Sequence, residues 1–591
     1  MPSFPADSPS MEASLILEDV TKRFRSGGRI VHALDAFSAR VRRGTVTGLI
    51  GPDGSGKTTL MRLIVGLLLP DHGRLTALGI DVIRNPLAVQ ESVGYMPQRF
   101  GLYEDLTVRE NLDLYADLQG VLPEQRPARY SELMHMTGLA RFTGRLAGDL
   151  SGGMKQKLGL ACTLVRSPDL LLLDEPTVGV DPVSRRELWS IVYRLVEQEG
   201  MTVLLSTAYL DEAERCQEVI LIHQGKPVGQ GKPGDFSARL TGRTFHVTSP
   251  VVNKRTLQES LARVPGVIDA VIQGDGVRLV TAPGASPDPA VLLPGRSDIR
   301  VAPVFPRFED SFVTLLKKDS ENPSPVFGKP DRRPAAPTEE DVIVVQHVKR
   351  RFGSFYAVKD ISFTVRRGEV FGLLGANGAG KSTTFRMLCG LLPASEGMLR
   401  VAGKDLRRAA AMARARIGYM AQRFSLYAGL SVLENLRFFS SVYGLRGGNQ
   451  RKRLEWAMNE FQLGSMADVI SGNLPLGYKQ RLALAAALMH EPEILFLDEP
   501  TSGVDPLARR EFWNRINALS VQGVTILVTT HFMEEAEYCD RLVIMADGEI
   551  LSQGTPADMK ERFRSAERPE PSLEDAFIGL METRQLRELV S

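Results

Sequence analysis

Two short stretches of this chain combine residue types that can bind phosphate. GPDGSGKT at Gly51–Thr58 and GANGAGKS at Gly375–Ser382 both fit the pattern G-x-x-x-x-G-K-[ST]. Glycines let the backbone curl so that successive N–H groups point at phosphate oxygens. Lys57 and Lys381 would place a positive charge on the β- and γ-phosphates of a nucleotide, and the hydroxyl after each lysine would ligate Mg²⁺. Each stretch follows an apolar strand-like run and precedes an apolar helical pattern, which is the context that such a loop needs.

A pair of carboxylates follows each of two other apolar runs. LLLLDEP contains Asp174 and Glu175, and ILFLDEP contains Asp498 and Glu499. Carboxylates at the C-terminal end of a buried strand suit the ligand crevice of a parallel sheet. The first of each pair would hold Mg²⁺, and the second would polarise the attacking water as general base. Taken alone, such a pair more often marks the charged start of a helix.

Polar residues at a strand end and at a helix start could complete such a site. Gln98 and Gln422 each end an apolar strand and begin a loop, where a neutral amide can reach Mg²⁺ or the attacking water. Ser151, Gly152 and Gly153 open a helix, so their hydroxyl and N–H groups form a second anion-binding terminus. An isolated glutamine is usually a surface residue. The recurrence of Gln98 in a second, similar block favours a functional role.

An aromatic side chain stands at an equivalent point near the start of each half. Phe24 and Phe352 each precede a glycine-containing turn, where the ring could stack on a nucleotide base. A half-buried strand aromatic is the other interpretation. With these two, the residues predicted to contact nucleotide are Gly51, Pro52, Asp53, Gly54, Ser55, Gly56, Lys57, Thr58, Thr59, Gln98, Ser151, Gly152, Gly153, Gly375, Ala376, Asn377, Gly378, Ala379, Gly380, Lys381, Ser382, Thr383, Gln422 and Gly477.

The spacing of these motifs indicates a duplication. Lys57 and Asp174 are 117 positions apart, and so are Lys381 and Asp498. Lys57, Gln98, Gly153, Asp174 and Asp181 all recur 324 positions later, as Lys381, Gln422, Gly477, Asp498 and Asp505. A repeat of this length is a duplicated domain and not a short solenoid unit.

Composition and pattern divide the chain into five segments. We predict a disordered tail at 1–14, a first domain at 15–240, a small α+β module at 241–316, a proline-rich linker at 317–340 and a second domain at 341–591. Charged residues make up 24% and the net charge is +2, so nucleic acid is not an expected partner. The four cysteines include no C-x-x-C pair, which favours buried thiols in a reducing cytoplasm.

Neither the N-terminus nor any apolar run predicts insertion into a membrane. The first residues lack the basic and apolar regions of a signal peptide, and Met11 is an alternative start to Met1. No uninterrupted apolar run approaches the ~18 residues that would suggest a membrane span. Any membrane role is therefore expected to come through a partner.

In their order along the chain, these motifs resemble those of the nucleotide-binding subunits of ATP-binding-cassette (ABC) transporters, with two cassettes fused in one chain. The resemblance covers nearly all of the sequence except the 241–316 module and the linker. The stretch LYEDLTVRENL and the closing EDAF-type helix look like the type-2 branch, the tandem ATPase subunits of multidrug exporters. The resemblance implies an α/β fold of two P-loop NTPase cassettes, each with a RecA-like core, an antiparallel β layer and a helical subdomain.

The resemblance also implies the ligands and their placement. ATP and Mg²⁺ would be the cofactors, and the two cassettes would meet head to tail, with each ATP between one phosphate loop and the other cassette's signature. The implied metal ligands are Thr58, Gln98 and Asp174 in the first cassette and Ser382, Gln422 and Asp498 in the second.

Two departures from the family pattern fall in different cassettes. The first cassette has Ala208 where the family has a switch histidine, whereas the second keeps His531. A histidine there can contact the γ-phosphate and orient water, which alanine cannot. In the second signature, Pro475 and Leu476 replace the serine and first glycine of LSGG. Proline has no N–H to donate, and leucine blocks close backbone approach.

Head-to-tail pairing would place both departures in one composite site and leave the other complete. We therefore expect an intrachain, asymmetric pair of cassettes. Glu499 and His531 would be the catalytic residues of the hydrolysing site, and Glu175 would remain in a site that binds ATP but turns over slowly. The alternative is that the altered site has drifted and uses other groups for the same task.

The resemblance implies an ATPase that drives export through one or two integral membrane permease subunits. The chain would then be cytoplasmic and peripheral at the inner face of the cell membrane. The alternative is a soluble tandem ATPase that acts on ribosomes or nucleic acid. Such relatives join their cassettes by a highly charged helical linker or carry clustered cysteines, and this chain has neither.

Overall fold

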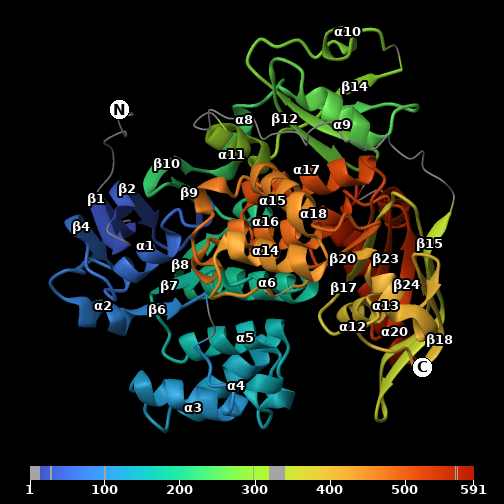
Figure 1. Cartoon of the computed structure of the whole chain (residues 1–591). Helices are drawn as coiled ribbons and strands as arrows, with labels where there is room; N and C mark the ends of the chain where they lie inside the picture. Colours follow the sequence, from blue (N-terminus) through green and yellow to red (C-terminus); the bar gives the residue numbers. More distant parts are fainter. Residues whose placement is uncertain are drawn as a thin grey trace. The chain divides into compact units, whose positions relative to one another are not determined.

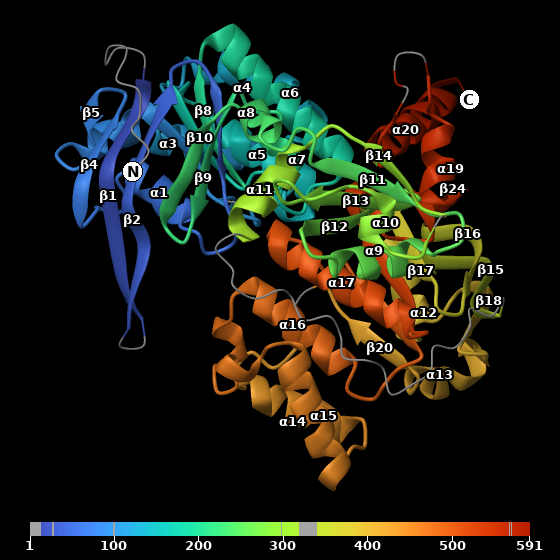
Figure 2. The same cartoon turned by 90° about the horizontal axis from the view of Figure 1, so that it is seen from above.

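The computed structural model describes residues 13–590 except 27–28, 99–100, 297, 318–339, 423, 566–567 and 569. The chain divides into two compact units, which are described separately (Figures 1 and 2). The first unit comprises Met1–Val180, Ser184–Arg239 and Arg307–Phe312, and the second comprises Asp181–Val183, Leu240–Pro306 and Val313–Ser591. Of the predicted tail at 1–14 and linker at 317–340, residues 1–12 and 318–339 lie outside the described residues. Ala13 and Ser14 are wrongly assigned to the tail, because they begin a strand, and Lys317 ends a helix.

A six-stranded sheet in the order β10-β9-β3-β8-β7-β6 forms the core of the first cassette. All neighbours are parallel except β10, which pairs antiparallel with β9. Its strands are β3 (Val46–Ile50), β6 (Val93–Met96), β7 (Leu170–Asp174), β8 (Thr202–Thr207), β9 (Glu218–His223) and β10 (Lys226–Gly231). Every residue of β3, β7 and β8 is buried, which explains their nearly continuous apolar sequences.

An antiparallel sheet in the order β2-β1-β4-β5 forms a second layer. Its strands are β1 (Ala13–Ser26), β2 (Arg29–Arg42), β4 (His72–Ala77) and β5 (Ile80–Asp81). Leu15 and Phe37 from this layer share a hydrophobic core with Leu60 of helix α1 (Lys57–Ile64) and Leu172 of β7. The helix that follows the phosphate loop is therefore held between the two sheets.

The remaining helices of the first cassette range from four to 18 residues. They are α2 (Pro86–Ser92), α3 (Val108–Leu118), α4 (Arg126–Thr137), α5 (Gly152–Thr163), α6 (Pro182–Glu199), α7 (Leu210–Ala213) and α8 (Pro233–Ala238), with 3-10 turns η1 (Ala140–Phe142) and η2 (Ala147–Asp149). Thr107 and Glu110 form a capping box at the start of α3. Helices α3 and α4 both pack on α5, the helix that begins at the signature, and form the helical subdomain.

The second cassette repeats this architecture with its two layers joined into one ten-stranded sheet, in the order β19-β18-β15-β16-β24-β23-β17-β22-β21-β20. The two layers meet where Asp360 pairs with Glu549. The strands are β15 (Asp341–Phe352), β16 (Phe355–Arg366), β17 (Val370–Gly375), β18 (Glu396–Val401), β19 (Lys404–Asp405), β20 (Ile417–Met420), β21 (Ile494–Asp498), β22 (Thr525–Thr530), β23 (Arg541–Ala546) and β24 (Glu549–Gly554). The helices are α12 (Lys381–Leu388), α13 (Leu406–Arg414), α14 (Val432–Val442), α15 (Gly447–Glu460), α16 (Leu476–Ala487), α17 (Pro506–Val521), α18 (Met533–Ala536), α19 (Pro556–Glu561) and α20 (Leu573–Val590), with 3-10 turns η3 (Gly464–Met466) and η4 (Ser471–Asn473).

The α+β module between the cassettes is a four-stranded antiparallel sheet in the order β12-β13-β11-β14. Its elements are β11 (Thr244–Thr248), α9 (Lys254–Ala262), β12 (Val267–Gln273), β13 (Gly276–Thr281), α10 (Pro289–Leu292) and β14 (Arg300–Pro303). This order is that of a split β-α-β, ferredoxin-like fold. Leu257 and Leu261 of α9 fill its core against Val247 and Leu279. Helix α11 (Phe308–Lys317) follows, and its Phe308 ring packs edge-on against Phe236 of α8 and beside Phe312.

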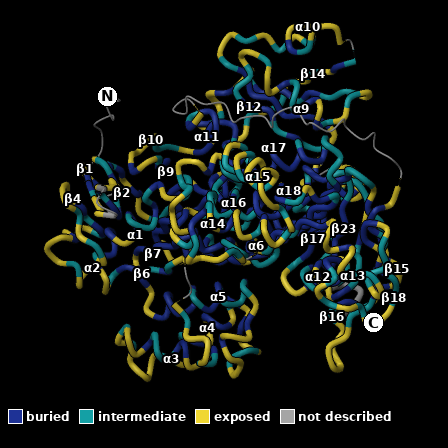
Figure 3. The backbone as a smooth tube through the Cα atoms, viewed as in Figure 1, coloured by how far each residue is buried: buried dark blue, intermediate teal, exposed yellow. Residues whose placement is uncertain are grey.

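Burial follows the parallel strands and the helices that face them (Figure 3). All four cysteines of the sequence are buried and free. None of the helices in the described part of the chain is long and apolar enough to cross a membrane. The predicted α/β fold, with two similar halves and a small α+β insert, is confirmed.

Candidate nucleotide sites

The first phosphate loop connects β3 to α1 and depends on glycine for its shape. Gly56 has a φ of 110°, and a Cβ there would lie 2.4 Å from the carbonyl oxygen of Ala33. The Lys57 side chain is 4% exposed. Its Nζ donates to the carbonyl oxygens of Gly51 at 2.9 Å and Pro52 at 3.2 Å, and lies 3.3 Å from Oε1 of Glu175. The buried ammonium group thus lies against the carbonyl oxygens of its own loop, where a bound phosphate would contact it.

The second phosphate loop connects β17 to α12 with the same geometry. Gly380 has a φ of 96°, and Nζ of Lys381 donates to the carbonyl oxygens of Gly375 at 2.6 Å and Ala376 at 2.9 Å. Burial lowers the pKa of Lys381, although the negative charge of Glu499 opposes that shift. An anion beside this buried ammonium would stabilise its charged form. In both cassettes the hydroxyl predicted to ligate Mg²⁺ lies in the first turn of the following helix, Thr58 in α1 and Ser382 in α12. The next residues, Thr59 and Thr383, were predicted to contact the nucleotide and lie in the same turns.

Each acidic pair stands at the carboxyl end of a central strand and is held from the neighbouring strand. In the first cassette, the Ser206 hydroxyl of β8 donates to Oδ1 of Asp174 at 2.6 Å and accepts from the Glu175 N–H at 3.0 Å. In the second, the Thr529 hydroxyl donates to Oδ1 of Asp498 at 2.6 Å and accepts from the Glu499 N–H at 2.9 Å. Ser206 and Thr529 were not predicted from the sequence. Only their place, two residues before the switch position, could have indicated them.

The two glutamates have backbone conformations that non-glycine residues rarely adopt. The φ of Glu175 is 52° and that of Glu499 is 46°. Nε2 of Gln98 donates to Glu175 at 2.5 Å, and Nε2 of Gln422 donates to Glu499 at 2.8 Å. Such strain at a buried carboxylate is typical of functional sites, because it fixes where the side chain points. The predicted lysine, glutamine and glutamate therefore lie together in each cassette.

The groups that face the two glutamates differ. In the second cassette, Nδ1 of His531 lies 3.2 Å from Oε2 of Glu499, and both side chains are buried. Burial acts to raise the pKa of Glu499, but the adjacent His531 ring and the charge of Lys381 together lower it. In the first cassette, Ala208 occupies the corresponding position and is 3% exposed. The methyl group of Ala208 cannot form a hydrogen bond with Glu175.

The carboxylates beside the lysines fit a divalent cation. Burial raises the pKa of Asp498, although the Thr529 hydroxyl and the Lys381 charge oppose the shift. A buried carboxylate of this kind is stabilised when a cation neutralises it. Carboxylate, hydroxyl and amide oxygens are the ligands that Mg²⁺ prefers. The donor set around Asp498 is thus suited to Mg²⁺.

The two signature helices begin differently. Ser151 is the N-cap of α5, and its side chain accepts a hydrogen bond from the Met154 N–H at 3.3 Å. Pro475 is the N-cap of α16 and makes no side-chain cap bond. A Cβ on Gly153 would lie 2.5 Å from Oγ and 2.6 Å from Cβ of Ser184, so only glycine fits there. Gly477, the equivalent residue, has Cβ of Ala508 at 3.5 Å, which is an ordinary contact distance.

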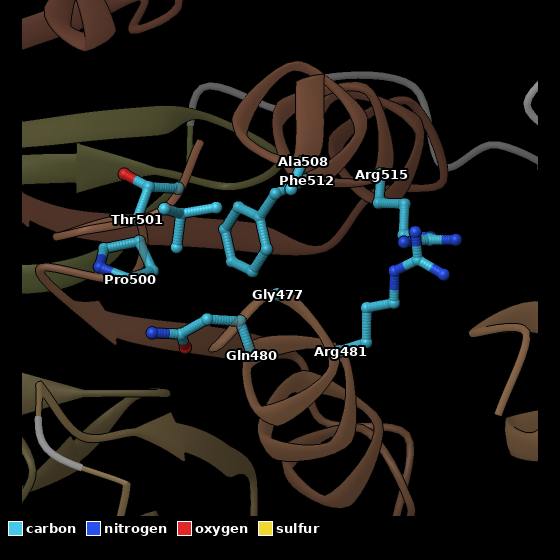
Figure 4. Close-up of a pocket in the computed structure, with 9 residues that line it drawn as sticks. Gly477, Gln480, Arg481, Pro500, Thr501, Ala508, Phe512 and Arg515 are labelled. Atoms are coloured by element: carbon cyan, nitrogen blue, oxygen red, sulfur yellow. The ribbon is translucent and has the colours of Figure 1, made fainter. Parts of the chain in front are cut away.

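A small cavity lies between the second signature helix and α17 (Figure 4). Gly477, Gln480 and Arg481 line it from α16, and Phe512 and Arg515 line it from α17. Its remaining lining residues, Pro500, Thr501, Val504 and Ala508, follow the acidic pair or open α17. The cavity therefore lies where the helical subdomain meets the core.

The two aromatic residues predicted to stack on a base are exposed on their strands. Phe24 on β1 is 40% exposed, with Nζ of Lys22 at 5.7 Å from its ring centre. Phe352 on β15 is 46% exposed, with the Arg350 guanidinium at 4.4 Å. The rings are accessible to a ligand, and their stacking role stays a prediction.

Comparison with known proteins places this architecture in a family. Residues 34–178 and 358–502 match the family model described as ABC transporter. The chain is 51% identical over 570 residues to "Probable multidrug ABC transporter ATP-binding protein YbhF" of Escherichia coli, an alignment that covers 96% of this chain and 98% of that one. The chain belongs to the ABC transporter family. Its cassettes are ABC-type ATPase domains, as the sequence predicted.

Other ABC relatives match a single cassette. "Linearmycin resistance ATP-binding protein LnrL" of Bacillus subtilis is 39% identical over 223 residues, covering 38% of this chain and 72% of that one. "Nod factor export ATP-binding protein I" of Ralstonia nicotianae is 41% identical over 219 residues, covering 37% and 68%. ATP-binding subunits of ABC transporters generally act with membrane permeases. The alternative of a ribosome-acting ATPase gains no support from these relatives.

Proposed function

We propose that this chain is the ATP-hydrolysing subunit of an exporter and acts on separate membrane permease subunits. The observation that carries the proposal is the 51% identity, over nearly the full length of both chains, to a protein named as a multidrug ABC transporter ATP-binding protein. Two shorter relatives are named for drug resistance and for export. Drugs are accordingly the substrate class that we propose. The chain would reach the inner face of the cell membrane through one or two permease partners.

We further propose that ATP is hydrolysed chiefly at the second cassette's acidic pair. Glu499 is aimed by its positive φ, by Gln422 and by His531, so it can accept a proton from the attacking water. His531 would orient that water and contact the γ-phosphate, and Lys381 would hold the β- and γ-phosphates. Mg²⁺ would be held by Ser382, Gln422 and Asp498, and by Thr58, Gln98 and Asp174 in the other cassette. Bound Mg²⁺ would neutralise charge on the phosphates.

The two cassettes would pair head to tail within one chain. Pairing two copies of the first cassette would put Ala208 in both sites, and pairing two copies of the second would put Pro475 in both. Only the pairing of the first with the second combines His531 with Ser151 and its glycines. The remaining site would bind ATP and turn it over slowly through Glu175.

The exporter proposal can be tested by capture from membranes. Tagged chain carrying Glu499→Gln is purified with ATP from detergent-solubilised membranes, because the substitution traps the closed state. Recovery of one or two polytopic membrane proteins is the expected result and would identify the permease. Recovery of ribosomal particles, with the chain absent from the membrane fraction, would overturn the proposal.

A further inference from the structure

The α+β module packs against the second cassette, within the second compact unit. Ile272 of β12 belongs to the same hydrophobic core as Trp513 of α17 and Cys539. Asp269 forms an ion pair with Arg510 of α17. Both figures of the fold place α9 beside α17 (Figures 1 and 2).

Two adjacent basic residues at the start of α9 hold the segment Glu537–Asp540. Nζ of Lys254 donates to the carbonyl oxygens of Glu537 and Cys539, both at 3.0 Å. The Arg255 guanidinium donates to the carbonyl oxygen of Tyr538 at 2.9 Å and to both carboxylate oxygens of Asp540 at 2.7 and 2.9 Å. The module therefore binds three successive carbonyl groups of this segment.

Arg255 is also fixed from the cassette side. Its side chain is 4% exposed, and its Nε donates to Oδ1 of Asn517 on α17 at 3.2 Å. Nδ2 of Asn517 donates in turn to Gln258 of the module at 3.1 Å. Its three guanidinium nitrogens thus bind a carboxylate, a carbonyl oxygen and an amide oxygen at once, so this buried arginine has little freedom to rearrange.

The segment held by Arg255 connects two parts of the catalytic site. The carboxylate of Asp540 accepts from the Val370 N–H at 2.9 Å, and its own N–H donates to the Val370 carbonyl oxygen at 2.8 Å. Val370 begins β17, the strand that ends at the second phosphate loop. On the other side, the segment follows α18, where Glu535 accepts a hydrogen bond from the hydroxyl of Thr530, next to His531.

The first cassette secures the corresponding segment with groups of its own. The Gln217 side chain accepts from the Val46 N–H at 2.6 Å, as Asp540 does from Val370. The Tyr193 hydroxyl of α6 donates to the Arg215 carbonyl oxygen at 3.0 Å. Position 193 corresponds to Asn517 under the 324-residue offset, and Arg215 precedes Cys216 as Tyr538 precedes Cys539. Arg255 thus supplies to the second cassette the hydrogen bond that a tyrosine supplies within the first.

We propose that Arg255 is a positioning residue for ATP hydrolysis in the second cassette, and that the module completes that cassette by fixing the segment between its switch histidine and its phosphate-loop strand. This inference rests on the proposed function, because it concerns the Glu499 site. The module then supports ATP hydrolysis by positioning this segment, and it is not merely a spacer between the cassettes.

The test uses the purified full-length chain and steady-state ATPase kinetics. Arg255→Ala should lower kcat by roughly threefold to thirtyfold, the range found when a residue couples to a site that it does not touch, while the KM for ATP stays within about twofold. Arg263→Ala is the matched control, since Arg263 lies on the same helix and pairs only with Glu259 among its described contacts. The control should leave kcat unchanged.

Three further variants make the result decisive. Arg255→Ala combined with Asn517→Tyr should regain part of kcat, because the tyrosine restores the arrangement of the first cassette. Arg255→Lys should give an intermediate loss of kcat. Lysine keeps the positive charge but cannot bind Asp540, Tyr538 and Asn517 together. In a Glu499→Gln background, Arg255→Ala should leave the residual activity unchanged.

The proposal is overturned if folded Arg255→Ala keeps full kcat, or if it lowers the residual activity of the Glu499→Gln chain by the same factor. Thermal unfolding of each variant checks the fold, and Arg255→Lys replaces Arg255→Ala if the latter does not fold. If Glu499→Gln itself leaves half or more of the activity, the proposed asymmetry fails. A kcat loss caused by Arg255→Ala in a Glu175→Gln background would still support the positioning role.

Discussion

The two cassettes hold their acidic pairs alike and differ in the group that faces them. In each cassette, a hydroxyl on the neighbouring strand donates a hydrogen bond to the aspartate. A glutamine donates to the glutamate, and the phosphate-loop lysine lies beside that glutamate. His531 lies 3.2 Å from Glu499, whereas the first cassette has Ala208 at the corresponding position. Both positions are buried. The comparison teaches that the scaffold of the site does not depend on the histidine, so the first cassette can lose it and keep its fold.

The signature helices differ in the opposite sense. The first has its serine cap and a glycine in close contact with Ser184, whereas the second starts at Pro475 and would accept a Cβ at Gly477 at an ordinary contact distance. Each cassette therefore keeps the element that the other has lost. This complementary loss is what an intrachain pair would tolerate and a pair of identical cassettes would not.

The largest effect is expected from the two glutamates. Glu499→Gln should lower the ATPase rate by about 10²-fold or more, as removal of a general base does, while Glu175→Gln should leave most of it. Steady-state hydrolysis by the two purified chains measures the difference. Equal losses would contradict the proposed asymmetry.

The next largest effect concerns the switch position. His531→Ala should lower kcat by about tenfold to 10²-fold, because Glu499 loses the group that orients it and the attacking water. Ala208→His should not restore that loss when the two substitutions are combined, since it acts in the other cassette. If Ala208→Gly, a small change at the same position, lowers kcat as much as His531→Ala does, the two positions are not functionally different.

A smaller effect separates the two signature glycines. Gly153→Ala should destabilise the first cassette by about 1–3 kcal/mol, because the new Cβ would lie 2.6 Å from Cβ of Ser184. Gly477→Ala should be neutral or stabilise its helix by up to ~1 kcal/mol. Denaturant unfolding compares the two, and adding Ser184→Gly to Gly153→Ala should recover part of the loss. Equal destabilisation would mean that the second helix is seated as closely as the first.

The smallest effect is expected at the helix caps. Ser151→Ala should cost about 0.5–2 kcal/mol of stability through the lost cap bond, and Pro475→Ser should gain at most about 1 kcal/mol. The shift of the unfolding midpoint measures both. A gain from Ser151→Ala would argue against the capping role of this hydroxyl.

The sequence predicted the repeated fold well, because the phosphate loops and the apolar strands before the acidic pairs are local patterns. The clusters of Lys57, Gln98 and Glu175 in one cassette, and of Lys381, Gln422 and Glu499 in the other, are also seen in the structure. Their roles in ATP turnover stay predictions. A strand–loop–helix motif carries its own geometry, which is why spacing alone could bring these residues together.

What the sequence could not predict depends on contacts between distant segments. The module follows the first cassette in the chain, yet Lys254 and Arg255 bind a segment almost 300 positions later. From sequence alone, two adjacent basic residues at the start of a helix predict a solvent-exposed surface. Ser206 and Thr529 were missed for a similar reason, because a hydroxyl near a strand end has no pattern that reveals a carboxylate on the next strand.

The buried cysteines have a practical consequence for following the motion of this protein. Burial raises the pKa of all four thiols, that of Cys539 to about 12, so each is shielded from reagents that attack the thiolate. A cysteine introduced on the surface would therefore react almost alone. Fluorescent donor and acceptor dyes could be attached to one cassette each without first rebuilding the protein as a cysteine-free version. The cycle of approach and separation could then be timed in single molecules of otherwise native sequence.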